Sequence, residues 1–114
     1  MQHSDIVRLR HMLDAAREAL TFSAGRSRRD LDTDRMLVLS LVRSIEIIGE
    51  AAGKISDECR IEHEKIPWQD IVAMRNRLIH AYFDVNLDIV WRTATEELPP
   101  LVSSLEEALS KSDV

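Results

Sequence analysis

The sequence holds little of what cross-links a chain, breaks its helices or anchors it in a membrane. A single cysteine, Cys59, excludes an internal disulfide and leaves too few ligands for a cysteine-based zinc cluster. Three glycines and three prolines are few for an all-β domain but natural for long helices. No apolar run approaches the length of a membrane span, and the first residues are polar, without the apolar core of a signal peptide. We therefore expect a cytoplasmic protein that has no contact with a membrane.

Positive charge is also in short supply. Lys and Arg number 15 against 20 Asp and Glu, which gives a formal net charge of −5. A protein that coats nucleic acid with its whole surface must neutralise phosphates, so this balance excludes that class but allows a local basic cleft. The 114 residues suit one domain, 1–114, with an ordinary apolar content of 45%. A chain of this length buries only about two-thirds of its unfolded surface, and such cores are often completed by a partner subunit.

Apolar residues recur every three or four positions in most of the sequence, as on one face of a helix. A first helix is predicted to begin at Ser4-Asp5 and to end at Ala24-Gly25. A second, capped by Asp32 or Thr33, is predicted to run to about Ile55. Its apolar stripe is wider than one neighbouring helix needs, so this helix should lie centrally or face a second subunit. The stripe comprises Leu37, Leu41, Ile45, Ile48, Ala52 and Ile55, widened by Leu39, Val42 and Ala51.

Gly49 lies inside this second helix, where glycine costs about 1 kcal/mol relative to alanine. A close approach of another backbone would explain its presence.

The second half of the chain predicts three further helices. Pro67 suits the first position of a third helix, since its missing N–H would have no partner there, and this helix should continue to about Ala81. The segment 82–85 is expected to be a turn or an extended link. Asn86 can cap a fourth helix, which Pro99-Pro100 should interrupt before a last helix. A short helical turn is expected within 56–64, and the whole indicates an all-α, antiparallel bundle of four to five helices.

The third helix carries polar groups away from its predicted core stripe of Ile71, Met74, Leu78 and Ala81. In a helix that continues to residue 81, Asn76 and His80 lie four apart on nearly the opposite side. Val72 and Ile79 are apolar, lie outside the core stripe and have no obvious role within the chain. This surface suggests a twin subunit related by a two-fold axis, which would bring two copies of His80 together.

Two histidines and two arginines across such a cleft would supply what RNA cleavage without a metal requires. Imidazole exchanges protons near neutral pH, so one copy of His80 could take the proton of a 2′-hydroxyl and the other could protonate the leaving 5′-oxygen. The guanidinium of Arg75 fits a phosphate and would stabilise its charged transition state.

The stretch from Met74 to Tyr82 resembles the Arg-x4-His-x-Tyr signature of the HepT-like ribonucleases of the HEPN superfamily. The similarity extends over nearly the whole chain from Asp32 to Leu101. It includes Ile47–Ala51, Ile66–Trp68, Asp84-Val85 and Val90-Trp91.

This resemblance implies a HEPN bundle that forms a two-fold homodimer and acts as a metal-independent endoribonuclease without a cofactor. It further implies a toxin of a type VII-like toxin–antitoxin pair, whose partner is an MntA-type nucleotidyltransferase that silences the toxin by transferring AMP to a tyrosine. By position in the motif, Arg75 and His80 would be catalytic, Asn76 their polar companion and Tyr82 the acceptor of AMP. AMP on Tyr82 would place a bulky anion beside Arg75 and block the RNA phosphate.

The same residues also have simpler structural interpretations. His80 could act as a cation at the end of its helix, and Tyr82 could be a core aromatic residue. Arg75 could form a surface ion pair of little energetic value. The carboxylates available to it are Asp70, Asp84 and Glu50. Asn76 could serve to orient His80.

Other polar residues suggest no separate site. The basic loop that contains Arg26, Arg28 and Arg29 is expected to be solvated, with RNA contact a minor alternative. No ligand spacing relates the remaining histidines, so a metal site is not expected. These histidines are His3, His11 and His63. Glu46 and Glu50 are expected to form a solvated or salt-bridged stripe with Arg43 and Lys54, and Trp68 and Trp91 are expected to be packing anchors.

Two other classes of function compete with the nuclease. A non-catalytic helical module could bind and regulate a partner nucleotidyltransferase, which the acidic net charge modestly favours. A purely structural dimerisation bundle is the third, and the outward polar residues argue against it.

Overall fold

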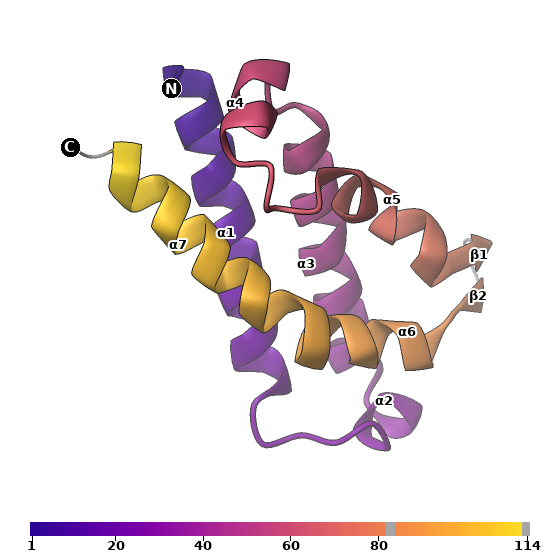
Figure 1. Ribbon diagram of the computed structural model, residues 1–114. Coiled ribbons are helices and arrows are strands. Elements are labelled where there is room, and N and C mark those ends of the chain that lie inside the picture. The colour runs from indigo at the N-terminus through magenta and orange to yellow at the C-terminus, as the bar shows by residue number, and fades with distance from the viewer. Residues whose placement is uncertain (82–83, 113–114) are drawn as a thin grey trace.

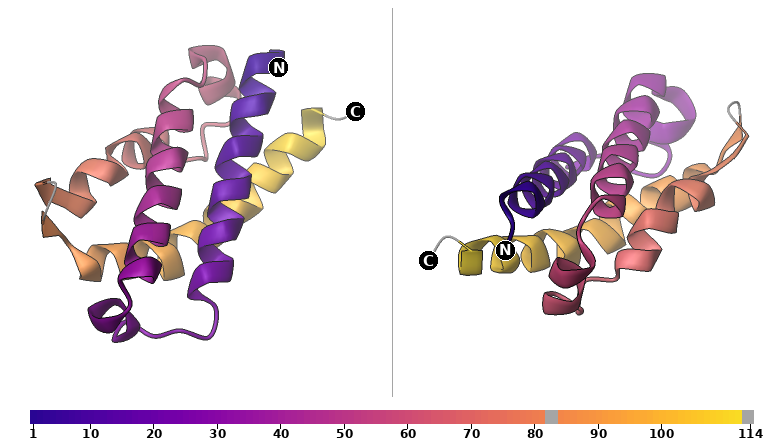
Figure 2. Two further views of the ribbon diagram at one scale, coloured as in Figure 1. Left: turned by 180° about the vertical axis from the view of Figure 1, so that it is seen from behind. Right: turned by 90° about the horizontal axis from the view of Figure 1, so that it is seen from above.

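The computed structural model describes residues 1–81 and 84–112 and is an α-helical bundle (Figure 1). Its longer helices are α1 (His3–Ser23), α3 (Arg35–Gly53), α5 (Trp68–Leu78) and α7 (Leu98–Ser112). Figure 2 shows two layers, with α1 and α3 side by side in one and α5 and α7 in the other. The smallest extent, 19 Å, matches the thickness of two stacked helices. The predicted all-α fold is therefore confirmed, and no helix among the described residues is long and apolar enough to cross a bilayer.

The core lies between these two layers, and the predicted stripe of α3 provides its centre. Leu41, Ile45 and Ile48 are fully buried there. Leu39, which was expected to widen the stripe, is 52% exposed and lies outside the core. The close approach predicted at Gly49 is present, because a Cβ at this position would lie 3.4 Å from the backbone oxygen of Ile71 in α5. The backbone of α5 therefore packs directly on α3 at Gly49, at a distance where a methyl group would make an ordinary van der Waals contact.

The first helix ends where the sequence predicted but begins differently. Gly25, just beyond α1, has a φ of 73°, a conformation that glycine adopts without strain. At the other end α1 begins at His3, and Asp5 is buried rather than placed at an exposed helix start. Its carboxylate accepts hydrogen bonds from the backbone N–H of Ser56 at 2.9 Å and from the Ser56 hydroxyl at 2.6 Å. This contact spans 51 residues, which local sequence patterns do not report.

Ser56 in turn caps α4 (Asp57–Glu62), the short helix expected within 56–64, by accepting from the N–H of Cys59 at 3.2 Å. The hydroxyl of Ser56 therefore donates to α1 and accepts from α4 at the same time.

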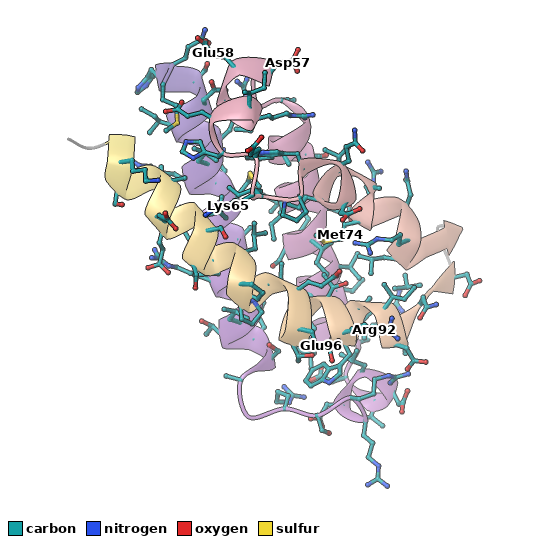
Figure 3. All side chains as sticks on the ribbon, viewed as in Figure 1. Asp57, Glu58, Lys65, Met74, Arg92 and Glu96 are labelled. Atoms are coloured by element: carbon teal, nitrogen blue, oxygen red, sulfur yellow. The ribbon has the colours of Figure 1, made fainter. Side chains whose placement is uncertain are left out.

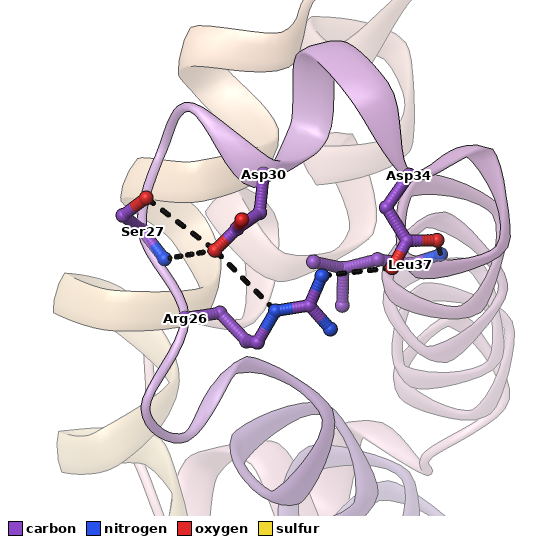
Figure 4. Close-up of polar contacts among 5 residues, drawn as sticks. All are labelled: Arg26, Ser27, Asp30, Asp34 and Leu37. Atoms are coloured by element: carbon purple, nitrogen blue, oxygen red, sulfur yellow. Dashed lines mark hydrogen bonds and ion pairs between the residues drawn. The ribbon is translucent and has the colours of Figure 1, made fainter.

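The cap of α3 is Asp34, and not Asp32 or Thr33 as predicted. The two expected residues belong to a separate short helix, α2 (Asp30–Thr33). An oxygen of Asp34 accepts from the N–H of Leu37 at 3.1 Å, and Arg26 contacts the other oxygen at 2.7 Å (Figure 4). Arg26 thereby draws the chain after α1 against the start of α3.

The last third of the chain forms a nearly continuous helical path, although Pro99-Pro100 was expected to interrupt it. It consists of α6 (Leu87–Arg92), the π-helical turn η1 (Thr93–Glu97) and α7. As predicted, Asn86 caps α6, accepting from the N–H of Ile89 at 3.1 Å. The prolines lie in the first turn of α7, and the N–H of Leu98 bonds to the carbonyl of Thr93, five residues back. The wider π turn accommodates the missing N–H groups without a break.

Candidate functional site

Helix α5 carries the first half of the motif and is held by buried groups at both ends. Pro67 directly precedes it, and the indole N–H of Trp68 donates to the carbonyl of His63 at 3.0 Å. Trp68 is buried, as a packing anchor should be. Met74 and Leu78 are also buried, and Figure 3 shows Met74 pointing into the bundle. The predicted core stripe is confirmed at Ile71, Met74 and Leu78, which fixes the direction of the other side chains of α5, but Ala81 lies beyond the helix, in a strand.

The helix ends at Leu78, three residues before the predicted end. The chain continues as β1 (Ile79–Ala81), which pairs antiparallel with β2 (Asp84–Val85) in a small hairpin at the edge of the bundle (Figure 1). The N–H of Asn86 donates to the carbonyl of Leu78 at 2.7 Å and closes the base of this hairpin. The strand pairs that replace the next helical turn join Ile79 to Val85, six positions ahead, and Ala81 to Asp84, three positions ahead.

His80 therefore lies in a strand. The expectation that His80 lies on the same helix as Asn76, one turn further on, is wrong because α5 ends at Leu78. The other motif residue beyond the helix, Tyr82, lies outside the described residues, as does Phe83.

Arg75 and Asn76 are exposed in the last turn of α5, as expected. In the part of the chain that the structure describes, Arg75 forms no ion pair or hydrogen bond, so the alternative pairing with Asp70, Asp84 or Glu50 is not observed. Arg77, two residues further, does have partners: Glu97 at 3.6 Å and the carbonyl of Asp70 at 3.5 Å. The guanidinium of Arg75 is thus available to an anion from outside the chain.

The basic loop after α1 is largely neutralised by carboxylates that sequence patterns did not identify. Arg28 contacts Asp32 at 3.0 Å and Asp88, in the first turn of α6, at 2.7 Å. The acidic partners hold the pKa of the Arg28 guanidinium above its usual value, chiefly through the hydrogen bond to Asp88. The i, i+4 spacing to Asp32 was visible in the sequence, whereas the contact with Asp88 spans 60 residues. The ion pair between Arg28 and Asp88 therefore attaches this loop to α6, which gives the loop a structural role in place of RNA contact.

No three His, Cys, Asp or Glu side chains in residues 1–81 and 84–112 are arranged to hold a metal ion. Cys59 is buried, and this burial together with the nearby Asp5 raises the pKa of its thiol to about 11. The thiol is therefore protonated at neutral pH and is a poor nucleophile.

Comparisons with known proteins agree with the resemblance carried by the motif. Residues 12–108 match the family described as Ribonuclease HepT-like. The chain is 41% identical over 103 residues to a protein of Caldanaerobacter subterraneus subsp. tengcongensis named "Putative RNase TTE0752", covering 90% of this chain and 92% of that protein. It is 37% identical over 78 residues to the "Probable ribonuclease HepT" of Thermococcus cleftensis, covering 68% of this chain and 71% of that one. No solved structure matches the chain. With the match extending over most of its length and including the motif at the end of α5, the chain belongs to the HepT-like ribonuclease family of the HEPN superfamily.

Proposed function

We propose that this protein is a metal-independent endoribonuclease that cleaves RNA with Arg75 and His80 at a cleft between two copies of the chain. The observation that carries the proposal is the exposure of Arg75, the arginine of the Arg-x4-His motif in this HepT-like chain. Arg75 lies exposed in the last turn of α5 and has no ion pair among the described residues. Arg26 and Arg28 are held by carboxylates, whereas Arg75, like Arg29 and Arg35, has no ion pair among the described residues, so its place in the motif is what distinguishes it.

The reaction is a transesterification within the RNA. One copy of His80 takes the proton of a 2′-hydroxyl, whose oxygen then forms a bond to the adjacent phosphorus. The bond from phosphorus to the 5′-oxygen breaks, and the other copy of His80 protonates that oxygen. Arg75 stabilises the charge that develops on the phosphoryl oxygens. The products are a 2′,3′-cyclic phosphate and a 5′-hydroxyl end, and acid–base assistance of this kind contributes about 10²–10⁴ in rate.

A two-fold homodimer supplies the second histidine in this scheme. Val72 supports it, since this apolar residue of α5 is 40% exposed one turn before Arg75, where no role within the chain requires an apolar side chain. An apolar contact beside the motif is what a symmetric interface around the cleft would use.

We further propose that the protein is the toxin of a type VII-like toxin–antitoxin pair, silenced in the cytoplasm by an MntA-type nucleotidyltransferase. The phenolic oxygen of Tyr82 would form a bond to the α-phosphorus of ATP, pyrophosphate would leave, and the phenol proton would pass to the transferase. The attached AMP would add an anion two residues from His80 in sequence and compete with RNA phosphate for Arg75. Intact mass after co-expression with such a transferase tests this step: addition of AMP that is lost in Tyr82→Phe supports it, and unchanged mass of the parent contradicts it.

Cleavage of RNA by the free protein in the presence of a chelator tests the nuclease itself. His80→Ala and Arg75→Gln should each lose at least a hundredfold in rate, while Arg35→Gln, an exposed arginine at the far end of α3, should cleave as the parent does. Circular dichroism should show the same helix content in all four proteins. The nuclease proposal is wrong if His80→Ala cleaves RNA at the parental rate, or if the fragments carry 5′-phosphate ends.

The second candidate is a non-catalytic helical module that binds and regulates a nucleotidyltransferase, which the net charge of −5 favours modestly. It predicts a stable complex with the transferase and no RNA cleavage by the free dimer. The cleavage assay therefore separates the two.

A further inference from the structure

A groove between α1 and α3 collects basic side chains far from the motif in sequence. Its volume is about 510 Å³, and its floor is made by small and apolar groups between the two helices. These are Val7, Ile47 and Ala51. His3, Arg8 and His11 line it from α1, and Lys54 from the end of α3. Figure 2, viewed from behind, shows these two helices in front, with the second layer on their far side.

The cationic side chains of this groove are not held in ion pairs with the described residues. Neither Arg8 nor Lys54 forms an ion pair with the described residues, and Glu50 is the one carboxylate among the lining side chains that the structure describes. Asp5, the acid nearest to them on α1, is 2% exposed and accepts both of its hydrogen bonds from Ser56. In a chain of net charge −5, this groove therefore presents an unusual local excess of N–H donors.

The groove is distinct from the proposed catalytic site. Gly49 faces α5, whereas Ile47 and Ala51 of the groove lie two residues before and after it, about 200° around α3. The groove and the motif helix therefore lie on opposite sides of α3. The groove cannot contribute to the bond-breaking step within one chain.

We propose that this groove is an accessory anion site that binds phosphate groups of the RNA substrate away from the cleaved bond. This inference rests on the proposed function. The guanidinium of Arg8 offers a planar pair of N–H groups that can bind two oxygens of one phosphate, and the ammonium of Lys54 adds a point charge. Ring N–H groups of His3 and His11 supply further donors along α1. The elongated arrangement over two turns of helix suits consecutive phosphates of a single strand better than one compact ion.

Salt dependence of binding tests the groove independently of cleavage. The probe is a short, fluorescently labelled 2′-O-methyl RNA oligonucleotide, which lacks the nucleophile and cannot be cut. The doubly substituted Arg8→Gln/Lys54→Gln protein should bind it more weakly. Its plot of log affinity against log salt should be flatter by about 1.4, because each phosphate contact with a single strand contributes about 0.7.

The matched control is Arg29→Gln/Arg35→Gln, which removes the same charge from two exposed arginines that have no ion pair among the described residues. Both lie at the opposite end of α3 from Lys54. If the groove variant and this control show equal slopes, the groove does not bind RNA phosphates and the inference is overturned. Absence of RNA cleavage by the parent would instead refute the proposed function, and the binding comparison would still be informative.

Free nucleotides offer the same phosphate chemistry, so a second measurement distinguishes the two sources. NMR signals of the His3 and His11 imidazoles should shift on addition of the oligonucleotide and should not shift with ATP at equal phosphate concentration. Shifts caused by ATP alone would assign the groove to a nucleotide and overturn its assignment to RNA.

Discussion

Replacement of Asp5 by alanine should cost about 2–4 kcal/mol of unfolding free energy. The Asp5 carboxylate is 2% exposed and accepts two hydrogen bonds from Ser56, and bonds to a charged partner contribute about 1.5–3 kcal/mol each. Part of this is offset because alanine also removes the cost of burying a carboxylate. The backbone N–H of Ser56 would then remain half-buried without an acceptor, at a cost of about 1–3 kcal/mol. The loss of the hydrogen bonds and the cost of the unpaired Ser56 N–H count partly the same effect. The net loss of unfolding free energy is therefore about 2–4 kcal/mol and not their sum.

Urea unfolding followed by circular dichroism measures this loss. With an m value of about 2 kcal/mol per molar urea, the midpoint should fall by roughly 1–2 M while m itself is unchanged. Asp14→Ala provides the control, since Asp14 is exposed on the same helix and forms no hydrogen bond or ion pair with the described residues. Its effect should stay within about 0.5 kcal/mol. A midpoint for Asp5→Ala equal to that of the control would refute the importance of this contact.

Two further variants separate the energy of the Asp5–Ser56 interaction from the individual contributions of the two side chains. Asp5→Asn keeps an oxygen that can accept from the Ser56 N–H but leaves the Ser56 hydroxyl without an anionic acceptor, so it should lose less than Asp5→Ala. Ser56→Ala loses the cap of α4 as well as the link to α1. Combined with Asp5→Ala in a double-mutant cycle, it should show a coupling energy of about 0.5–3 kcal/mol. Strict additivity would mean that the two side chains act independently.

Three other predictions follow from contacts elsewhere. Arg26→Gln should raise the pKa of the Asp34 carboxyl, which its hydrogen bond to Arg26 now lowers, and NMR titration would measure this. Because that folded-state pKa is depressed, the contribution of the pair to stability is present above the unfolded pKa of about 3.9 and is lost as pH falls through the folded value. The Cys59 thiol, with its pKa raised to about 11, should react slowly with thiol reagents at neutral pH. Its contribution to the free energy of unfolding should be lost only as pH rises from the pKa of a thiol in the unfolded chain towards 11. If the proposed dimer forms through Val72, Val72→Glu should give monomers in analytical ultracentrifugation and abolish the proposed cleavage. An unchanged sedimentation coefficient would exclude Val72 from the interface.

Sequence patterns predicted the helices well because the burial of one helical face is a local property. Leu9, Leu13 and Ala16 of α1 are buried at intervals of three and four residues, as are Leu41 and Ile45 of α3. Pairs such as these have to share a face wherever the helix packs. The predicted cap at Asn86 is confirmed for the same reason, since its hydrogen bond reaches only three residues ahead.

The predictions that are wrong depend on contacts distant in sequence. Asp5 does lie in the first turn of α1, as predicted, but no local pattern indicated that it would be buried against Ser56, 51 residues later. Asp32 or Thr33 was predicted to cap this helix, but Asp34 caps α3, and its ion pair with Arg26 contributes to this outcome. The end of α5 was predicted too late because the hairpin that replaces its last turn needs β2 as a partner. None of these outcomes is encoded by the spacing of apolar residues.

The early end of α5 has a consequence for the site itself. With Arg75 in a helix and His80 in a strand, the two residues belong to different elements, and their relative position depends on how the junction at Leu78 is held. Asn86 holds it, through its N–H to the Leu78 carbonyl and through its side-chain cap on α6. Arg28 then ties α6 to the loop after α1 through Asp88. A basic loop that the sequence left open as a minor candidate for RNA contact is therefore better explained as part of the support that fixes the hairpin carrying His80.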